Sequence, residues 1–373
     1  MRVVQFVIPS VALAGGRRVG YVDGDDVVDV TAVDESLTSV FDVFEASQAS
    51  GTPFDETLSG AGSLDSGGSG DSGRPGNNFS RLDYGELLGA EVGGNSPYLI
   101  APFDHPDDHR LLVSGTGLTH TGSAKSRDQM HSDDDAPSGG PAGGKPPEEP
   151  LTDSAKMFQM GIEGGKPEAG ERGVSPEWFY KGNGTIVRGP GEGLELPAFA
   201  LDGGEEPELA GCYFIDKSGM PHRVGFTLGN EWSDHETERV NYLYLAPSKL
   251  RSCAIGPELV TDFAFDELAL QCTVERDGEL IYESGPLYTG EEYMSHTLAN
   301  CEDHHFKYPL HRVPGDGHIH FFGTSRISYG SRDWKFRAGD VITVSADGFS
   351  AALSNSVVGG DAAEGRAVRV VKA

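Results

Sequence analysis

The chain has 373 residues, which is enough for two domains, or for one large domain with a smaller appendage, and for a substantial core. Hydrophobic residues make up only 37% of it, and Gly (52) and Pro (22) are plentiful, so we expect many turns and a β-rich protein. The 58 acidic and 29 basic residues give a formal charge of −29, which fits a very soluble or salt-adapted protein and argues against nucleic acid as a partner.

The cysteines and the N-terminus indicate the compartment. The four cysteines are widely spread and form no CxxC pair, so neither a disulfide framework nor a structural zinc site is expected. They are Cys212, Cys253, Cys272 and Cys301. The opening "MRVVQFVIPSVALAGG" lacks a basic segment followed by a long apolar one, and no run approaches 18 apolar residues. We therefore expect buried free thiols in a cytoplasmic protein that does not enter a membrane.

Residues 1–97 predict a small N-terminal domain. Residues 2–31 alternate short β-branched runs with Gly and Asp-Gly turns, which is typical of a small antiparallel sheet. Residues 39–47 carry apolar side chains at helical spacing. Residues 59–78 are so rich in Gly, Ser and Asp that they cannot bury enough apolar area to order themselves. We interpret them as a disordered insertion.

Residues 98–373 predict a larger catalytic domain. Strand character resumes at residues 98–120, and a Pro/Gly-rich stretch then predicts a lid loop near residues 131–155. From residue 175 onward the chain consists mostly of short strands with turn signals, plus one predicted helix at residues 291–304. The fold class is therefore α+β, mainly β.

Two short acidic clusters, "EEPEL" and "LGNEWSDHE", lie close together along the chain. Glu206 and Glu208 are separated by one residue, so on a strand their side chains project from the same face. Two such carboxylates repel each other unless a cation lies between them. A hard ion such as Mg²⁺ would satisfy both, and Glu231 could complete a set of three oxygen ligands. By itself, an E-x-E in so acidic a chain is more often exposed surface charge.

Three cations are candidates for binding an anion. Lys181 follows three aromatic residues in "EWFYKGNG", where it is either a charge-paired surface residue or a cation close to an anionic ligand. Lys125 and Arg127 in "SAKSRD" are either solvated cations or an anion clamp in an active-site loop.

Six motifs follow one another in an order that identifies a family. They are "SPEWFYKGNG" (175–184), "EPELAGCYFID" (206–216), "LGNEWSD" (228–234), "CAIGPELVTD" (253–262), "HFFGTSRISYG" (320–330) and "FRAGDVITVSADGFSAALSNSV" (336–357). In these motifs the chain resembles the fumarylacetoacetate hydrolase superfamily over residues 98–372. The segment "RLLVSGTGLTHTGSAKSRDQMH" (110–131) is most similar to the branch of 2-keto-3-deoxy-L-arabinonate dehydratase-like enzymes.

The resemblance implies a mixed β-sandwich or roll, with a small N-terminal β domain, in a homodimer. It also implies a divalent ion, Mg²⁺ or alternatively Mn²⁺ or Ca²⁺, held by Glu206, Glu208 and Glu231. The family more often has Asp at the third position, which leaves Asp234 as a rival ligand. Thr324, in the "GTS" that stands where the family has a Gly-Thr pair, would reach the substrate carboxylate.

The resemblance also suggests catalytic residues. Lys181 matches the family lysine near the substrate, with Tyr180 beside it as a substrate-binding residue, and Lys249 lies two residues from where an ungapped count sets another family lysine. The family's catalytic histidine falls on Ser123, which is a poor general base by itself. A histidine occurs three residues earlier, and His120 is either the replacement base or a structural histidine.

Five further histidines show no regular metal-ligand spacing, so ordinary structural roles are favoured. They are His304, His305, His311, His318 and His320.

The expected partner is a small anionic 2-oxo acid. The favoured function is dehydration of a 2-keto-3-deoxy sugar acid (pentonate-like), in sugar acid catabolism such as arabinose metabolism, giving a 2-oxo acid semialdehyde through a metal-stabilised enolate. A C–C bond hydrolase of acylpyruvate or 2,4-diketo-3-deoxy sugar acids is the first alternative. A non-catalytic sugar-acid binding protein is the second.

Overall fold

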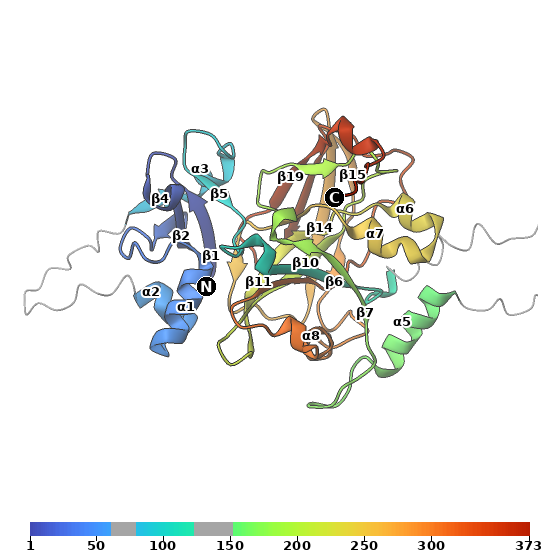
Figure 1. Cartoon of the computed structure of the whole chain (residues 1–373), viewed down its shortest axis with the longest axis horizontal. Coiled ribbons are helices and arrows are strands. Elements are labelled where there is room, and N and C mark those ends of the chain that lie inside the picture. Colours follow the sequence, from blue (N-terminus) through green and yellow to red (C-terminus); the bar gives the residue numbers. More distant parts are fainter. Residues whose placement is uncertain (61–79, 123–151) are drawn as a thin grey trace, which may run out of the picture.

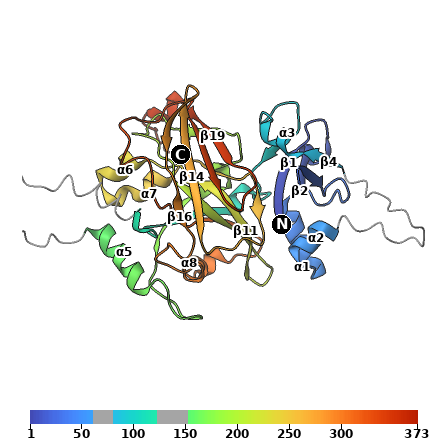
Figure 2. The same cartoon turned by 180° about the vertical axis from the view of Figure 1, so that it is seen from behind.

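The computed structural model describes residues 1–60, 80–122 and 152–373. Within these residues the chain is mostly β-sheet, and the blue N-terminal elements lie at one end of the molecule in two opposite views (Figures 1 and 2). The expected Gly/Ser-rich insertion and the expected lid loop fall largely on residues 61–79 and 123–151, which lie outside the described residues.

Two sheets make up the fold. The large sheet contains β1 (Arg2–Val7), β2 (Arg17–Asp23), β3 (Asp26–Asp29), β4 (Arg81–Asp83), β5 (Tyr98–Ile100), β6 (Leu111–Gly117), β7 (Glu177–Asn183), β8 (Val187–Arg188), β10 (Pro207–Ile215), β11 (Pro221–Asn230), β12 (Cys253–Ile255), β13 (Leu259–Val260) and β17 (Gly317–Phe321). The second sheet contains β9 (Leu194–Leu196), β14 (Leu268–Arg276), β15 (Glu279–Glu283), β16 (Leu287–Thr289), β18 (Val341–Ala346) and β19 (Leu353–Gly359).

The helices of the described residues are short. They are α1 (Val40–Ser50), α2 (Phe54–Gly60), α3 (Tyr84–Gly89), α5 (Asp153–Gly164), α6 (His235–Val240), α7 (Leu245–Lys249) and α8 (Leu298–Phe306). Single 3₁₀ turns are η1 (Leu13–Gly16), η2 (Asp108–Arg110), η3 (Gly184–Ile186), η4 (Tyr242–Tyr244), η5 (Pro309–His311) and η6 (Ala362–Gly365).

The centre of the large sheet is the antiparallel pair β10 and β11. The sheet runs β4-β3-β2-β1-β13-β11-β10-β17-β6-β7, so β10 and β11 have neighbours on both sides. All nine residues of β10 are buried, which explains why its sequence "PELAGCYFI" is almost continuously apolar rather than alternating. A strand enclosed in this way holds its side chains in fixed positions, and the acidic residues at its start share that rigidity.

The main core lies between the two sheets. Leu209, Leu228 and Trp232, at and beyond the ends of β10 and β11, belong to the same buried cluster as Leu270 and Val344 of the second sheet. This face-to-face packing of two sheets is the sandwich that the fold class predicted. All four cysteines are buried and unpaired, as expected.

The N-terminal strands continue the large sheet. β1 pairs with β2 and β5, and also with β13, where Arg2 lies opposite Val260. The antiparallel sheet and the helix predicted for residues 39–47 are confirmed, and Ser39 caps that helix by accepting from the Asp42 amide. The domain boundary at residue 97 stays a prediction.

The helix predicted at residues 291–304 is only partly correct. The structure begins it at Leu298, because the Thr297 side chain accepts from the Asn300 amide and caps the helix there. The residues before it form turns, in which the amides of Tyr293 and Met294 both donate to the Gly290 carbonyl.

Candidate metal centre

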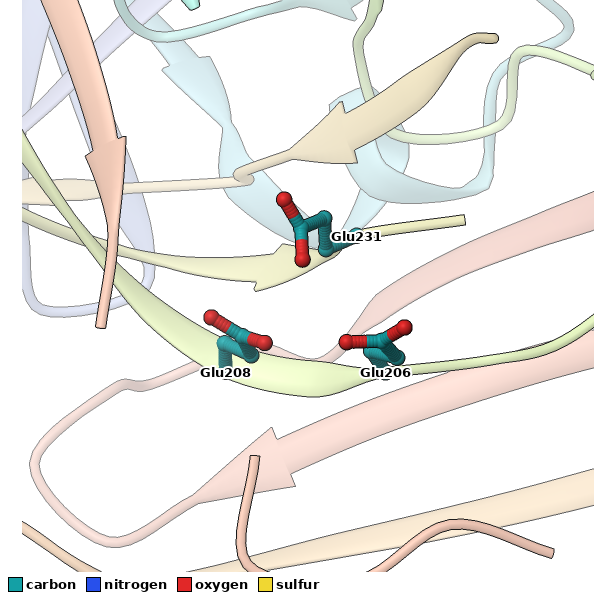
Figure 3. Close-up of side chains that lie close together, drawn as sticks. All are labelled: Glu206, Glu208 and Glu231. Atoms are coloured by element: carbon teal, nitrogen blue, oxygen red, sulfur yellow. The ribbon is translucent and has the colours of Figure 1, made fainter. Parts of the chain in front are cut away.

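Three buried carboxylates converge at the start of the central strand pair. Glu206 and Glu208 flank the first residue of β10, and Glu231 follows the last residue of β11. Each offers one oxygen, and these three oxygens lie within 4.8 Å of one another. Figure 3 shows Glu206 and Glu208 on one strand, with both carboxylates directed towards Glu231 on the neighbouring one. The described residues contain no other group of this kind.

The backbone explains the convergence. β10 and β11 pair antiparallel with Glu208 opposite Gly229, and the pairing continues past their ends, because the Glu231 amide donates to the Glu206 carbonyl at 2.9 Å. Glu206 and Glu231 are therefore cross-strand neighbours, and Glu208 projects from the same face two residues along. The expectation that a strand and its return bring the two acidic clusters together is met.

Each carboxylate has one oxygen engaged by a fixed donor. Lys249 Nζ donates to Glu206 Oε1 at 2.5 Å and to Glu231 Oε2 at 3.0 Å. The Gly323 amide donates to Glu208 Oε2 at 2.7 Å. The other oxygens of Glu208 and Glu231, both Oε1, are buried and have no hydrogen-bond partner among the described residues. Buried carboxylate oxygens without partners are costly unless something binds them.

A glycine leaves room beside one of these free oxygens. A Cβ placed on Gly115 of β6 would lie 2.9 Å from Glu231 Oε1 and 2.6 Å from the Phe179 ring. The three converging ligand atoms are all carboxylate oxygens, the type that a hard divalent cation prefers over thiolate or imidazole. The residues present therefore fit Mg²⁺, Mn²⁺ or Ca²⁺.

The electrostatics of the cluster are those of a site short of positive charge. Burial, followed by the charges of Glu231 and Glu206, raises the pKa of Glu208 well above its ordinary value. Burial also raises the pKa of Glu231 to about 7, although Lys249 opposes the shift. Burial opposes ionisation of Glu206 too, but Lys249 and His235 hold its pKa well below the ordinary value. Burial works against the charge on Lys249, yet Glu206 and Glu231 keep its pKa above the usual range.

His235 is a member of the site that sequence reasoning missed. Its Nε2 lies 2.9 Å from Glu206 Oε1, and because an ionised carboxylate can only accept, that nitrogen carries the proton. The ring packs on Gly204, where a Cβ would lie 2.1 Å from its Nδ1. The only sequence signal was a histidine four residues after Glu231, in a chain with many histidines.

Lys181 and Asp234 lie near the carboxylates but are engaged elsewhere. Lys181 is buried, and its Nζ donates to the carbonyls of Trp232 at 2.6 Å and Lys249 at 3.0 Å. Burial lowers the pKa of Lys181 to about 8. Asp234 accepts from Arg251 at 3.0 Å and caps α6 through the Thr237 amide. The structure therefore does not bring Asp234 into the group of converging carboxylates, and it places Lys181 as a clamp between two backbone segments.

Thr324 and His120 lie on neighbouring loops. Thr324 directly follows Gly323, whose amide donates to Glu208, and the Thr324 hydroxyl donates to the Arg326 carbonyl at 3.2 Å. His120 is buried, with Nδ1 2.9 Å from the Thr119 hydroxyl and Nε2 3.0 Å from that of Thr289. Burial lowers the pKa of His120 to about 4.

His120 nevertheless lines an open pocket. The pocket has a volume of about 270 Å³, and its wall also includes Gly122, Tyr288, Ser325 and Arg326. The candidate base therefore lies at the wall of a cavity that the loop carrying Thr324 helps to form.

The remaining predicted residues are not near the carboxylates or cannot be placed. Tyr180 is 44% exposed on β7. Strand alternation puts its side chain on the face opposite that of Phe179, whose ring centre lies 4.8 Å from Lys249 Nζ. Ser123, Lys125 and Arg127 lie outside the described residues.

Four of the other histidines form a buried cluster of their own. His305 Nε2 lies 3.0 Å from His318 Nδ1, His305 accepts from the Trp178 indole at 3.1 Å, and His320 bonds to Ser114 at 2.9 Å. His311 stacks on His305 with 4.8 Å between ring centroids. Burial lowers the pKa of His318 and of His320 to about 3, so both rings are neutral at pH 7.

The fold is that of the fumarylacetoacetate hydrolase proteins. Over 96% of its length the chain is similar to 2-keto-3-deoxy-D-arabinonate dehydratase complexed with magnesium and 2,5-dioxopentanoate, covering 99% of that chain with a TM-score of 0.62 and 19% identity. It is also similar, over 96% of its length, to the fumarylacetoacetate hydrolase of Exiguobacterium antarcticum, covering 99% of that chain with a TM-score of 0.54 and 17% identity. The predicted fold is thus confirmed.

A curated relative gives a more particular likeness. The chain is 29% identical over 187 residues to the "Probable 2-keto-3-deoxyxylonate dehydratase" of Haloferax volcanii. That match spans 49% of this chain and 60% of the relative. No family model matches the chain. Among the described residues, no helix is both long and apolar enough to span a membrane.

Proposed function

We propose that this protein is a Mg²⁺-dependent dehydratase of a 2-keto-3-deoxy sugar acid of pentonate type, releasing water to give 2,5-dioxopentanoate. The observation that carries the proposal is the group of buried carboxylates, Glu206, Glu208 and Glu231, each with one oxygen committed to a donor. Likeness to the Haloferax volcanii relative and to a dehydratase of the same fold supports the choice of substrate class.

The chemistry needs a group that stabilises negative charge when the C3 proton leaves. A divalent ion held by the three carboxylates would supply it as a Lewis acid for the C1 carboxylate and C2 carbonyl oxygens. Loss of the C3 proton and of the C4 hydroxyl removes one water and leaves a C3–C4 double bond. Loss of a C5 proton and return of a proton to C3 then give the C4–C5 enol, which tautomerises to the semialdehyde.

The chain's own residues have four roles in this proposal. Lys249 places a buried ammonium beside Glu206 and Glu231, where it can offset charge that develops on the substrate. Thr324, which follows the glycine whose amide fixes Glu208, is the residue that the resemblance assigns to the substrate carboxylate. His120 stays the candidate base, and Lys181 holds the backbone of Trp232 and Lys249 together.

The test is a comparison of two substrates with purified protein and Mg²⁺. We expect semialdehyde from 2-keto-3-deoxypentonate and no pyruvate from a 2,4-diketo-3-deoxy acid. Pyruvate from the diketo acid alone would establish the C–C hydrolase instead. Binding of either acid without turnover would establish a sugar-acid binding protein.

Three finer expectations accompany this function. We propose that the protein works as a homodimer, in the cytoplasm, and in arabinose catabolism. Each stays a prediction from the resemblance, and sedimentation of the purified protein tests the first.

A further inference from the structure

Every carboxylate of the site is restricted to one free oxygen. Lys249 engages Glu206 Oε1 and Glu231 Oε2, and the Gly323 amide engages Glu208 Oε2. Glu206 Oε1 is held twice, because His235 Nε2 also lies 2.9 Å from it. The free oxygens Glu208 Oε1 and Glu231 Oε1 belong to side chains that are each only 1% exposed.

These donors cannot easily move aside. The Gly323 amide is part of the backbone, at φ +92°, in a position where a Cβ would meet the Thr119 hydroxyl at 2.3 Å. His235 is packed on Gly204 and lies at the first residue of α6, directly after Asp234, which Arg251 fixes at 3.0 Å. Lys249 ends α7 and is 1% exposed. The carboxylates are therefore oriented before any ion arrives.

Such a site offers one oxygen per carboxylate, whereas the ions it could take differ in what they need. Ca²⁺ coordinates six to eight oxygens at about 2.3–2.6 Å, often with a bidentate carboxylate. Mg²⁺ coordinates six oxygens at about 2.0–2.1 Å, and several of them are usually water. Turning any one of these carboxylates to bind through both oxygens would require it to give up a buried hydrogen bond.

We propose that the site selects Mg²⁺ and Mn²⁺ against Ca²⁺, and that His235 is a positioning residue that enforces this by holding Glu206 to one free oxygen. The proposal rests on the metal centre of the proposed function, but not on the identity of the substrate. Partners of ligating side chains commonly change metal affinity by about 10–100-fold when they are replaced.

The test is calorimetric titration of the metal-stripped full chain with Mg²⁺, Mn²⁺ and Ca²⁺, without substrate. In the wild type we expect Mg²⁺ and Mn²⁺ each to bind at least about tenfold more tightly than Ca²⁺. His235→Asn moves the donor back to about the position of Nδ1, and we expect the preference for Mg²⁺ over Ca²⁺ to fall about tenfold. His235→Gln restores an N–H near the position of Nε2 and should recover the preference.

The matched control is His222→Gln. His222 is on β11, pairs with Asp216 at 3.0 Å and has a 38% exposed side chain, so its replacement should leave the ion preference unchanged. Thermal unfolding in EDTA checks that each variant is folded. Equal binding of Ca²⁺ and Mg²⁺ by the wild type, or a preference unaffected by His235→Asn, would overturn the proposal while leaving the metal centre standing. Failure of all three ions to bind would remove the metal centre and the proposed function with it.

Discussion

Replacing Lys249 with methionine tests whether the site is balanced by a buried cation. The side chain is 1% exposed, bonds to Glu206 and Glu231 and lies 4.8 Å from the centre of the Phe179 ring. Methionine keeps the volume and the contact with the ring but removes the charge. In metal-free protein the three carboxylates would then share a buried space without the ammonium.

The expected loss of stability follows from burial. Removing one partner of a buried ion pair costs about 3–5 kcal/mol, because the other charge is left uncompensated. An unfolding entropy of about 2.1 cal/mol/K per residue gives about 0.8 kcal/mol per degree for this chain, so the melting temperature in EDTA should fall by about 4–6 °C. Lys217→Met removes a charge from a side chain that is 79% exposed, and should change the unfolding free energy by less than about 0.5 kcal/mol.

Added Mg²⁺ should reverse the loss in this variant. The ion takes over the role of the missing ammonium, and at a concentration of 100 times Kd it stabilises the fold by about 2.7 kcal/mol. We therefore expect Mg²⁺ to raise the melting temperature of Lys249→Met by more degrees than that of the wild type, measured by differential scanning calorimetry. Equal melting temperatures of the two proteins in EDTA would refute the reasoning, and so would an equal response to Mg²⁺.

Three further predictions address single residues. Glu208→Gln keeps an acceptor for the Gly323 amide but removes a charged metal ligand. Mg²⁺ affinity, measured by calorimetry, and turnover, measured by product assay, should each fall at least about 100-fold, while the melting temperature of the metal-free protein stays unchanged. Lys181→Met removes the side-chain donor of the buried Trp232 carbonyl, whereas the Lys249 carbonyl still accepts from the Arg251 amide at 2.9 Å, so the change should cost about 1–3 kcal/mol in denaturant unfolding; an unchanged midpoint would contradict the clamp. His120 has a pKa lowered from 6.5 to about 4, so its neutral form adds stability that is complete above pH 6.5 and is lost as the pH falls towards 4. The stability advantage of the wild type over His120→Gln should therefore shrink by about 3 kcal/mol between pH 7 and pH 4, and a constant difference would show that the native ring titrates normally.

The carboxylates could be predicted from sequence because their placement depends only on strand geometry. An E-x-E at the start of an apolar strand puts Glu206 and Glu208 on one face, and an antiparallel return brings Glu231 opposite. The ordered motifs predicted the fold, and the similarity to solved structures of that fold confirms it.

Strand geometry also separates two residues of the predicted site. Tyr180 and Lys181 are adjacent on β7, so their side chains point to opposite faces and cannot both face one substrate. The structure buries Lys181 and leaves Tyr180 44% exposed. The alternation of "EWFYKGN" predicts these opposite faces, whereas the resemblance to the family assigned both residues to the substrate.

His235 could not have been found in this way. Its contact with Glu206 depends on the chain turning at Asp234, where a side-chain cap starts α6, and on the absence of a Cβ at Gly204. Both are tertiary details that spacing along the sequence does not express. The same holds for Lys249, whose two carboxylate partners lie 43 and 18 residues away.

The cations of the site indicate the charge of the ligand. The ammonium groups of Lys181 and Lys249 are both engaged, the first by the Trp232 and Lys249 carbonyls and the second by Glu206 and Glu231. A second carboxylate on the substrate would therefore find no free cation in these two lysines. An uncompensated buried charge is costly, so a dicarboxylate should bind at least about tenfold more weakly. The matched pair is 2-oxopentanoate and 2-oxoglutarate, which share the 2-oxo acid and five carbons and differ in the charge of the far end. When the two acids are titrated into the Mg²⁺-loaded protein, 2-oxopentanoate should bind more tightly than 2-oxoglutarate. Tighter binding of 2-oxoglutarate would show that a further cation faces the distal end of the substrate. That result would favour a dicarboxylate hydrolase.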